Sequence, residues 1–175
     1  MNITELKGTT VFVVDDNINN LNVVADHLTP FGLKVIPFKS GEAALAVVEK
    51  RLPDIILLDV MMPDGIDGFE TCRRLKTNPQ THNIPVIFIS AASETVNKVT
   101  GFNLGGVDYI AKPFELEELL SRVYVHTIHR LQRNLVKASR SSKKRYWPEP
   151  RHSEKPTRRC SWKSPSENRP KPDYA

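Results

Sequence analysis

Five short apolar runs, separated by segments with helical spacing, constrain the fold of this chain most strongly. The runs are TVFVV (10–14), LKVIPF (33–38), DIILLD (54–59), IPVIFIS (84–90) and VDYIAK (107–112). Three of them are rich in Val and Ile and nearly continuous, which is typical of strands buried on both faces. Alternation of strand and helix five times over predicts an α/β fold, a doubly wound five-stranded parallel sheet with five helices.

The segments between the runs carry helix signals. Ser40 is a candidate N-cap, and Gly32 a candidate C-cap. The segment 94–106 is a weaker helix, because it contains β-branched residues and Gly101 in its middle. The segment 115–136 is the clearest, and its apolar stripe comprises Leu116, Leu119, Leu120, Val123 and Ile128. We interpret such stripes as core positions rather than cofactor contacts.

The pattern ends after residue 137. Residues 134–175 contain 12 basic and 4 acidic residues, whereas residues 1–133 contain 13 basic and 16 acidic ones. Six of the chain's 13 prolines also lie beyond residue 137. Such a composition buries too little apolar surface to offset chain entropy, so residues 138–175 are predicted to be a disordered basic tail rich in Pro and Ser. Residues 131–137 are predicted to continue the last helix as a linker.

The composition gives no sign of a membrane or secreted protein. No apolar run approaches the roughly 18 residues that a transmembrane helix needs. The N-terminus lacks the basic and apolar regions of a secretory signal. Cys72 and Cys160 form no metal-ligand spacing. We therefore expect a cytoplasmic protein without a membrane span or a disulfide.

Chemically distinctive residues stand at the ends of four predicted strands. Asp15 and Asp16 follow the first, Asp59 ends the third, Ser90 the fourth and Lys112 the fifth. Each alone is an ordinary turn, cap or loop residue, but the carboxyl ends of parallel strands share one edge of the sheet, where ligands bind. Three carboxylates there repel one another unless a cation intervenes, and Mg²⁺ prefers oxygen ligands of this kind. Lys112 supplies a point charge suited to a phosphate oxygen.

The motifs VVDDN, ILLDVMMP, VIFISA and GGVDYIAKPF occur in this order along residues 8–130. In order and spacing they resemble the receiver domain of two-component response regulators. The resemblance implies a flavodoxin-like sheet with strand order 2-1-3-4-5 and a receiver domain spanning residues 8–130. It also implies a signalling protein rather than an enzyme, whose only reactions are self-catalysed phosphoryl acceptance and slow dephosphorylation.

The resemblance assigns a role to each site residue. Asp59 would be the phosphoacceptor, taking the phosphoryl group from a sensor histidine kinase or a phosphotransfer protein. Asp15, Asp16 and Asp59 would hold Mg²⁺ together with the backbone carbonyl of Met61. Lys112 would bond a phosphoryl oxygen.

The resemblance also implies a conformational switch. The Ser90 hydroxyl would move toward the phosphoryl group as Tyr109 turns inward, and the bond before Pro113 would be cis. A downstream effector would bind the surface formed by residues 94–106, 107–112 and 115–136, and a homodimer is a further option.

One loop departs from the pattern of the family. Gly68 stands nine residues after Asp59, where eight are expected. The loop is therefore one residue longer, around Asp64–Gly65, which should alter the rim of the site and the choice of partner. Asp59, Met62 and Pro63 stay in register, so the chemistry should survive.

Other functions stay open at this stage. A phosphatase of the haloacid dehalogenase type also uses a strand-end Asp and Mg²⁺, but DVM lacks the second acid of its Asp-x-Asp pattern. Nucleic acid is not expected as a partner, although Tyr146, Trp147 and Trp162 among the basic tail residues could bind it by stacking. Alternatively, the tail is a frameshift product. With either origin of the tail, we expect a stand-alone or truncated regulator without an output domain.

Overall fold

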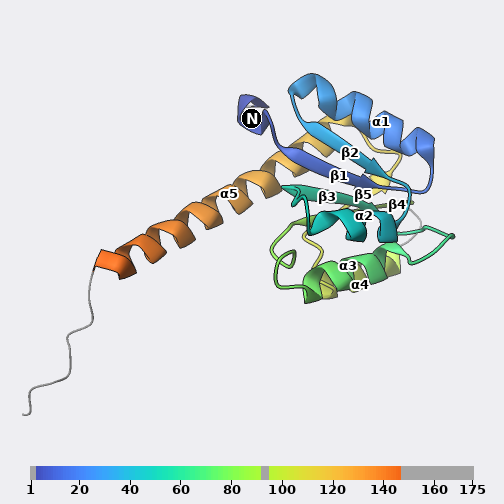
Figure 1. Cartoon of the computed structure of the whole chain (residues 1–175). Coiled ribbons are helices and arrows are strands. Elements are labelled where there is room, and N and C mark those ends of the chain that lie inside the picture. The colour runs from blue at the N-terminus through green and yellow to red at the C-terminus, as the bar shows by residue number, and fades with distance from the viewer. Residues whose placement is uncertain (1–2, 92–94, 147–175) are drawn as a thin grey trace, which may run out of the picture.

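A parallel sheet between two layers of helices forms the body of the molecule (Figure 1). The computed structural model describes residues 3–91 and 95–146. The strands are β1 (Thr10–Val14), β2 (Lys34–Phe38), β3 (Ile55–Asp59), β4 (Val86–Ala91) and β5 (Asp108–Lys112). They pair in the order β2-β1-β3-β4-β5, all parallel. The predicted fold class and strand order are confirmed.

Five α-helices connect and follow the strands. They are α1 (Ile18–Leu28), α2 (Gly41–Val48), α3 (Gly68–Thr77), α4 (Thr95–Asn103) and α5 (Leu116–Tyr146). Short 3₁₀ turns lie at Ile3–Leu6 and Thr29–Phe31. Helices α1 and α5 cover one face of the sheet, and α2, α3 and α4 cover the other (Figure 1).

Side-chain caps define where three of these helices begin. Asn17 accepts a hydrogen bond from the Asn19 N–H at the start of α1. Ser40 caps α2 through the Ala43 N–H, as its sequence position predicts. Asp67 caps α3 through the Glu70 N–H at 2.7 Å. Each cap satisfies a backbone donor that the helix itself cannot.

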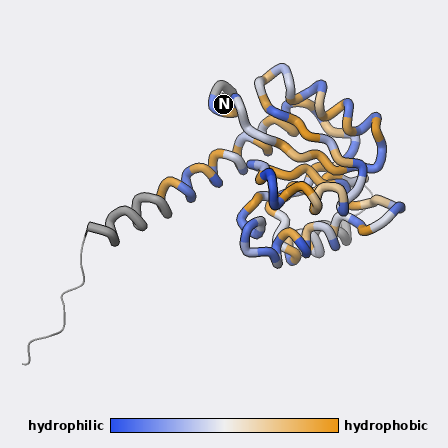
Figure 2. Tube along the Cα trace, in the orientation of Figure 1, coloured by the Kyte–Doolittle hydropathy of each residue, from blue (hydrophilic) through white to orange (hydrophobic). Residues whose placement is uncertain are grey.

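Hydrophobic residues run along the strands (Figure 2). Their side chains lie on both faces of the sheet and create two separate cores. In β1, Val11 and Val13 face the α1 and α5 layer, whereas Phe12 and Val14 face the α2 and α3 layer. All five residues of β3 are buried, including its last residue, Asp59. Strand β3 is therefore buried up to its carboxyl end, where the charged Asp59 stands.

Helix α5 is longer than the sequence pattern predicts. It continues past residue 137 to Tyr146 and extends away from the sheet (Figure 1). This stretch includes residues 138–146, where the composition places the start of the tail. The added stretch contains Ala and basic residues and no proline before Pro148, and basic residues stabilise a helix near its C-terminus. The predicted disorder of residues 147–175 lies outside the described residues.

None of the helices in the described part of the chain combines the length and the apolar character that crossing a bilayer requires.

Cys72 is expected to be chemically inert in the folded protein. Its thiol is fully buried on α3, and burial raises its pKa to about 11, although the nearby Lys76 charge acts in the opposite direction. At pH 8 only about one thiol in a thousand would be ionised, and the thiolate is the reactive form. In a Cys160→Ser variant, Ellman's reagent should not react at pH 8 until urea unfolds the chain. Rapid stoichiometric reaction under native conditions would contradict this packing.

Thr127 offers a test of the α5 packing. Its side chain is 1% exposed, and its hydroxyl has no hydrogen-bond partner among the described residues. Thr127→Val should raise the free energy of unfolding by about 1 kcal/mol, because it removes a buried unsatisfied polar atom and keeps the shape. Thr127→Ser should lower it by about 0.8 kcal/mol, because a buried methyl group is lost. Urea titrations would measure both free energies of unfolding. A less stable Thr127→Val and an unchanged Thr127→Ser would show that the hydroxyl has a hydrogen-bond partner.

Candidate functional site

Three carboxylates meet at the carboxyl edge of the sheet. Val14 of β1 pairs with Leu58 of β3, so Asp15 and Asp59 leave neighbouring strands at the same level. Oxygen atoms of Asp15, Asp16 and Asp59 lie within 4.8 Å of one another. Asp15 and Asp59 are only 4% and 6% exposed, whereas Asp16 is open to solvent. The structure thus brings together the three acids that the sequence predicts to converge.

Lys112 reaches this cluster from the end of β5. Its Nζ donates a hydrogen bond to Asp15 Oδ2 at 2.7 Å and lies 3.1 Å from Asp59 Oδ2. Burial alone would lower the pKa of Lys112, but the bond to Asp15 and the charges of Asp59 and Asp15 outweigh it and raise the pKa. Lys112 is therefore a fixed cation between two strands. The peptide bond to Pro113 is cis, the isomer that the resemblance implies.

The negative charge of Asp59 is not fully compensated by Lys112. Burial raises the pKa of its carboxyl; the Lys112 charge lowers it and the Asp15 charge raises it, and the net direction is upward. A further cation would relieve this unfavourable burial of negative charge. The available donors are carboxylate oxygens, the ligands that Mg²⁺ prefers. The residues present therefore fit a divalent metal site.

Asn20 is a further residue of the site that the sequence analysis did not identify. Its Nδ2 lies 3.0 Å from both carboxylate oxygens of Asp15, and the Asn17 N–H donates to the same carboxylate at 2.9 Å. Helix α1 begins immediately after the acids, so its first turn lies over them. The sequence signal for this contact was the position of Asn20 in the first turn of a helix that starts directly after the acids.

Ser90 and Tyr109 are in direct contact. Both side chains are buried, and their hydroxyl groups form a hydrogen bond between β4 and β5. The Tyr109 ring also packs near Phe88, with ring centroids 6.4 Å apart. The two residues that the resemblance assigns to a switch therefore lie side by side, with Tyr109 turned inward.

The loop after Asp59 buries Met62 and is closed by Gly68. Met62 is buried, whereas the Met61 side chain is 61% exposed. The Gly68 N–H donates to the Val60 carbonyl at 3.0 Å. A Cβ at Gly68 would lie 2.1 Å from the Asp59 carbonyl oxygen, so only glycine fits this closure. The loop still closes on Gly68 despite its additional residue.

A cavity of about 380 Å³ adjoins Lys112 on the α1 side of the cluster. Its lining residues are Asn20, Val23, Lys112, Pro113 and Phe114. Apolar atoms dominate its wall, and Asn20 and Lys112 connect it to the acidic cluster.

Comparisons with known proteins agree with this geometry. The family model described as the response regulator receiver domain matches residues 11–124. The chain is 32% identical over 136 residues to a probable cyclic di-GMP phosphodiesterase of Vibrio cholerae, covering 78% of this chain and 30% of that protein. It is 42% identical over 113 residues to the response regulator PleD of Caulobacter vibrioides, covering 65% and 25%.

Solved structures show the same likeness. A putative response regulator from Chloroflexus aurantiacus superposes with a TM-score of 0.67 and 37% identity, covering 70% of this chain and 99% of that one. The two curated relatives above are much longer, and the match takes in only 30% and 25% of their lengths. Since the family model covers more than half of the chain, this protein belongs to the response regulator receiver domain family.

Proposed function

We propose that the chain is a phosphorylatable receiver of a two-component phosphorelay, with its receiver domain spanning residues 8–130 and a helical linker beginning at residue 131. In this proposal Asp59 accepts a phosphoryl group from a phosphohistidine of a sensor histidine kinase or phosphotransfer protein. The observation that carries it is the Lys112 ammonium shared by two buried carboxylates, beside the exposed Asp16. Family membership supports the same assignment.

The transfer depends on neutralising negative charge. A carboxylate oxygen of Asp59 attacks phosphorus in line, the P–N bond breaks, and the histidine nitrogen leaves with its electron pair. Lys112 stabilises charge on the phosphoryl oxygens. Mg²⁺, held by Asp15, Asp16, Asp59 and the Met61 carbonyl, would supply the remaining positive charge. The cavity beside Lys112 supports approach of the donor from the α1 side.

Phosphorylation would switch a protein surface. A phosphoryl group adds about −1.5 to −2 of charge at neutral pH. In the proposed switch the Ser90 hydroxyl moves toward the phosphoryl group, and the Tyr109 side chain turns further inward as Ser90 moves. The contact between these hydroxyls supports this coupling. The effector, or a second copy of the chain, would then bind the surface of α4, β5 and α5, and we place the protein in the cytoplasm.

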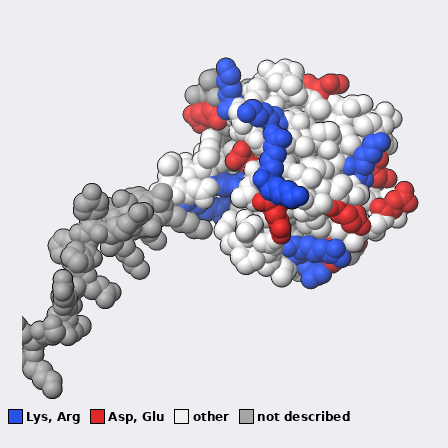
Figure 3. Space-filling model, in the orientation of Figure 1, with Lys and Arg blue, Asp and Glu red and all other residues white. Residues whose placement is uncertain are grey.

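The alternative functions have less support. A phosphatase of the haloacid dehalogenase type needs an acid where this chain has the exposed Met61. Nucleic-acid binding would rest on the tail, most of which lies outside the described residues. On the face of the body shown in Figure 3, basic side chains are interspersed with acidic ones. Such a mixed surface does not favour nucleic acid.

Asp59→Asn should abolish phosphorylation. With acetyl phosphate and Mg²⁺, the wild-type chain should gain one phosphoryl group by intact mass spectrometry, and the variant none, because the amide is not nucleophilic. Asp64→Asn, which alters an exposed acid of the same loop, should be labelled like the wild type. Labelling that persists in Asp59→Asn would identify a different acceptor.

Lys112→Ala should separate metal binding from phosphoryl transfer. Removing a cation this close to the acids should tighten Mg²⁺ binding about tenfold. Two unit charges 4 Å apart interact by about 1 kcal/mol in bulk water and by about 4 kcal/mol near a protein surface. The same variant should be phosphorylated more slowly, because Lys112 no longer stabilises the phosphoryl oxygens. Isothermal titration and labelling rates would measure the two effects, with Lys34→Ala as the distant control. Weaker Mg²⁺ binding in Lys112→Ala would contradict the predicted competition.

A further inference from the structure

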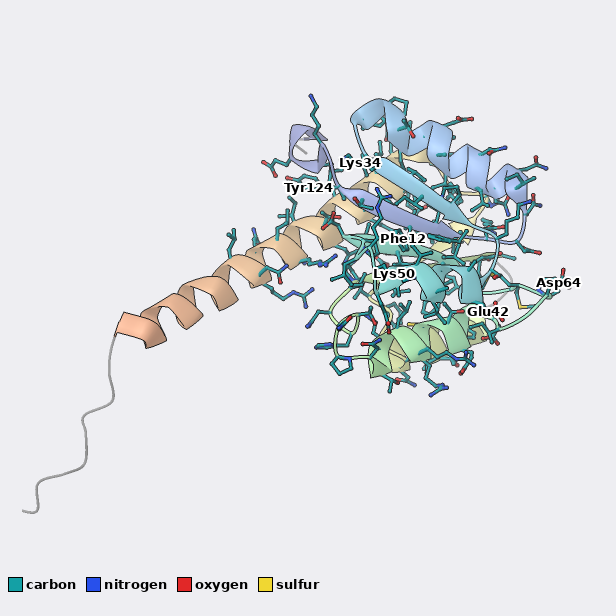
Figure 4. The ribbon with its side chains drawn as sticks, viewed as in Figure 1. Phe12, Lys34, Glu42, Lys50, Asp64 and Tyr124 are labelled. Atoms are coloured by element: carbon teal, nitrogen blue, oxygen red, sulfur yellow. The ribbon has the colours of Figure 1, made fainter. Side chains whose placement is uncertain are left out.

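The loop between β3 and α3 is tied to the start of α2 by one side chain. Glu42 Oε1 accepts a hydrogen bond from the Ile66 N–H at 2.8 Å, across 24 residues of sequence. Glu42 lies in the first turn of α2, two residues after the Ser40 cap. Figure 4 shows Glu42 near the base of the protruding loop that carries Asp64. This bond links the outer part of the loop to a second element of the fold.

The loop backbone is shaped to receive the Glu42 carboxylate. A Cβ at Gly65 would lie 2.6 and 2.9 Å from the two carboxylate oxygens of Glu42, so a larger residue there would push this carboxylate away from the loop. Gly65 also has a φ of +108°, a conformation that favours glycine. The additional residue of this loop falls at Asp64–Gly65, so Glu42 meets the chain where the loop departs from the expected length.

A second contact places the Ile66 side chain against the first turn of α2. A Cβ at Gly41 would lie 3.0 Å from Ile66 Cγ1 and 2.0 Å from Thr71 Oγ1, so loop and α3 both rest closely on the first turn of α2. The Ile66 N–H is the main cause that lowers the pKa of Glu42. The bond needs only one acceptor oxygen, which the side-chain amide of a glutamine also provides.

We propose that Glu42 is a positioning residue that holds the β3–α3 loop in place and thereby sets the Mg²⁺ affinity of the acidic cluster. The inference rests on the proposed function, in which the Met61 carbonyl of this loop is a metal ligand. Glu42 touches neither the acids nor Lys112 in this scheme. It acts by limiting the conformations of the segment between Met62, which is buried, and Gly68, which closes the loop.

A purely structural role makes different predictions. An acid in the first turn of a helix stabilises that helix through the partial positive charge of its N-terminus. In that case Glu42→Gln and Glu42→Ala would lower the melting temperature equally, and neither would alter the loop or the metal site. The two roles therefore differ in loop dynamics, in Mg²⁺ affinity and in rescue by glutamine, which keeps an acceptor oxygen.

The first measurement is amide hydrogen exchange of the metal-free full chain, resolved at Ile66 by NMR. Glu42→Ala should accelerate exchange of the Ile66 amide by about three- to tenfold, the change expected from one hydrogen bond. Glu42→Gln should stay within about twofold of the wild type, since the acceptor is retained. Unchanged exchange at Ile66 in Glu42→Ala would overturn the loop contact.

The second measurement is the Kd of Mg²⁺ by isothermal titration. Glu42→Ala should weaken binding by about three- to tenfold and slow labelling by acetyl phosphate in parallel, whereas Glu42→Gln should not. Asp64→Asn controls for the loss of a nearby negative charge and should leave the Kd within about twofold of the wild-type value.

The outcomes separate this inference from the proposed function. A wild-type chain that binds Mg²⁺ and is labelled at Asp59, with the same Kd in Glu42→Ala, would overturn the positioning role alone. Equal weakening by Glu42→Gln and Glu42→Ala would also overturn it, because charge rather than the hydrogen bond would be responsible. A wild-type chain that neither binds Mg²⁺ nor is labelled would instead overturn the proposed function, while exchange at Ile66 would still decide the loop contact.

Discussion

Electrostatic balance at the carboxyl edge of the sheet governs the rest of this structure. Asp15 and Asp59 are buried side by side, and Lys112 is shared between them. Because Lys112 carries one charge and the cluster contains three acids, negative charge remains in excess. Burial, together with the Asp15 charge, raises the pKa of Asp59 despite the neighbouring Lys112. An excess of this kind favours a divalent cation and, once that is bound, an anionic phosphoryl group. Family membership and local physics point to the same chemistry.

Strand pairing and a close backbone turn, as well as side-chain contacts, position the acids at the edge of the sheet. Parallel pairing of β1 with β3 brings the acids to one level, and two apolar cores hold the strands that carry them. Gly68 permits the chain to turn closely past the Asp59 carbonyl. Asp59 is thus held at the end of a fully buried strand, and the loop that follows it closes through the Gly68 N–H on the Val60 carbonyl.

Much of this could be predicted from the sequence because the relevant signals are local. Apolar runs identified all five strands, and charged residues at their ends identified the acids and Lys112. The C-terminal end of α5 could not be predicted in the same way, since the composition changes at residue 138 and the helix ends at Tyr146. The bond between Glu42 and Ile66 could not be predicted, because it joins distant segments through a loop whose path no sequence periodicity reports.

A crystal structure grown with Mg²⁺ and beryllofluoride would test the central claim most directly. The account predicts a metal ion coordinated by Asp16, Asp59 and the Met61 carbonyl. Beryllium should be attached to Asp59, with Lys112 turned toward a fluoride. A metal-free cluster, or beryllofluoride attached to another residue, would contradict it.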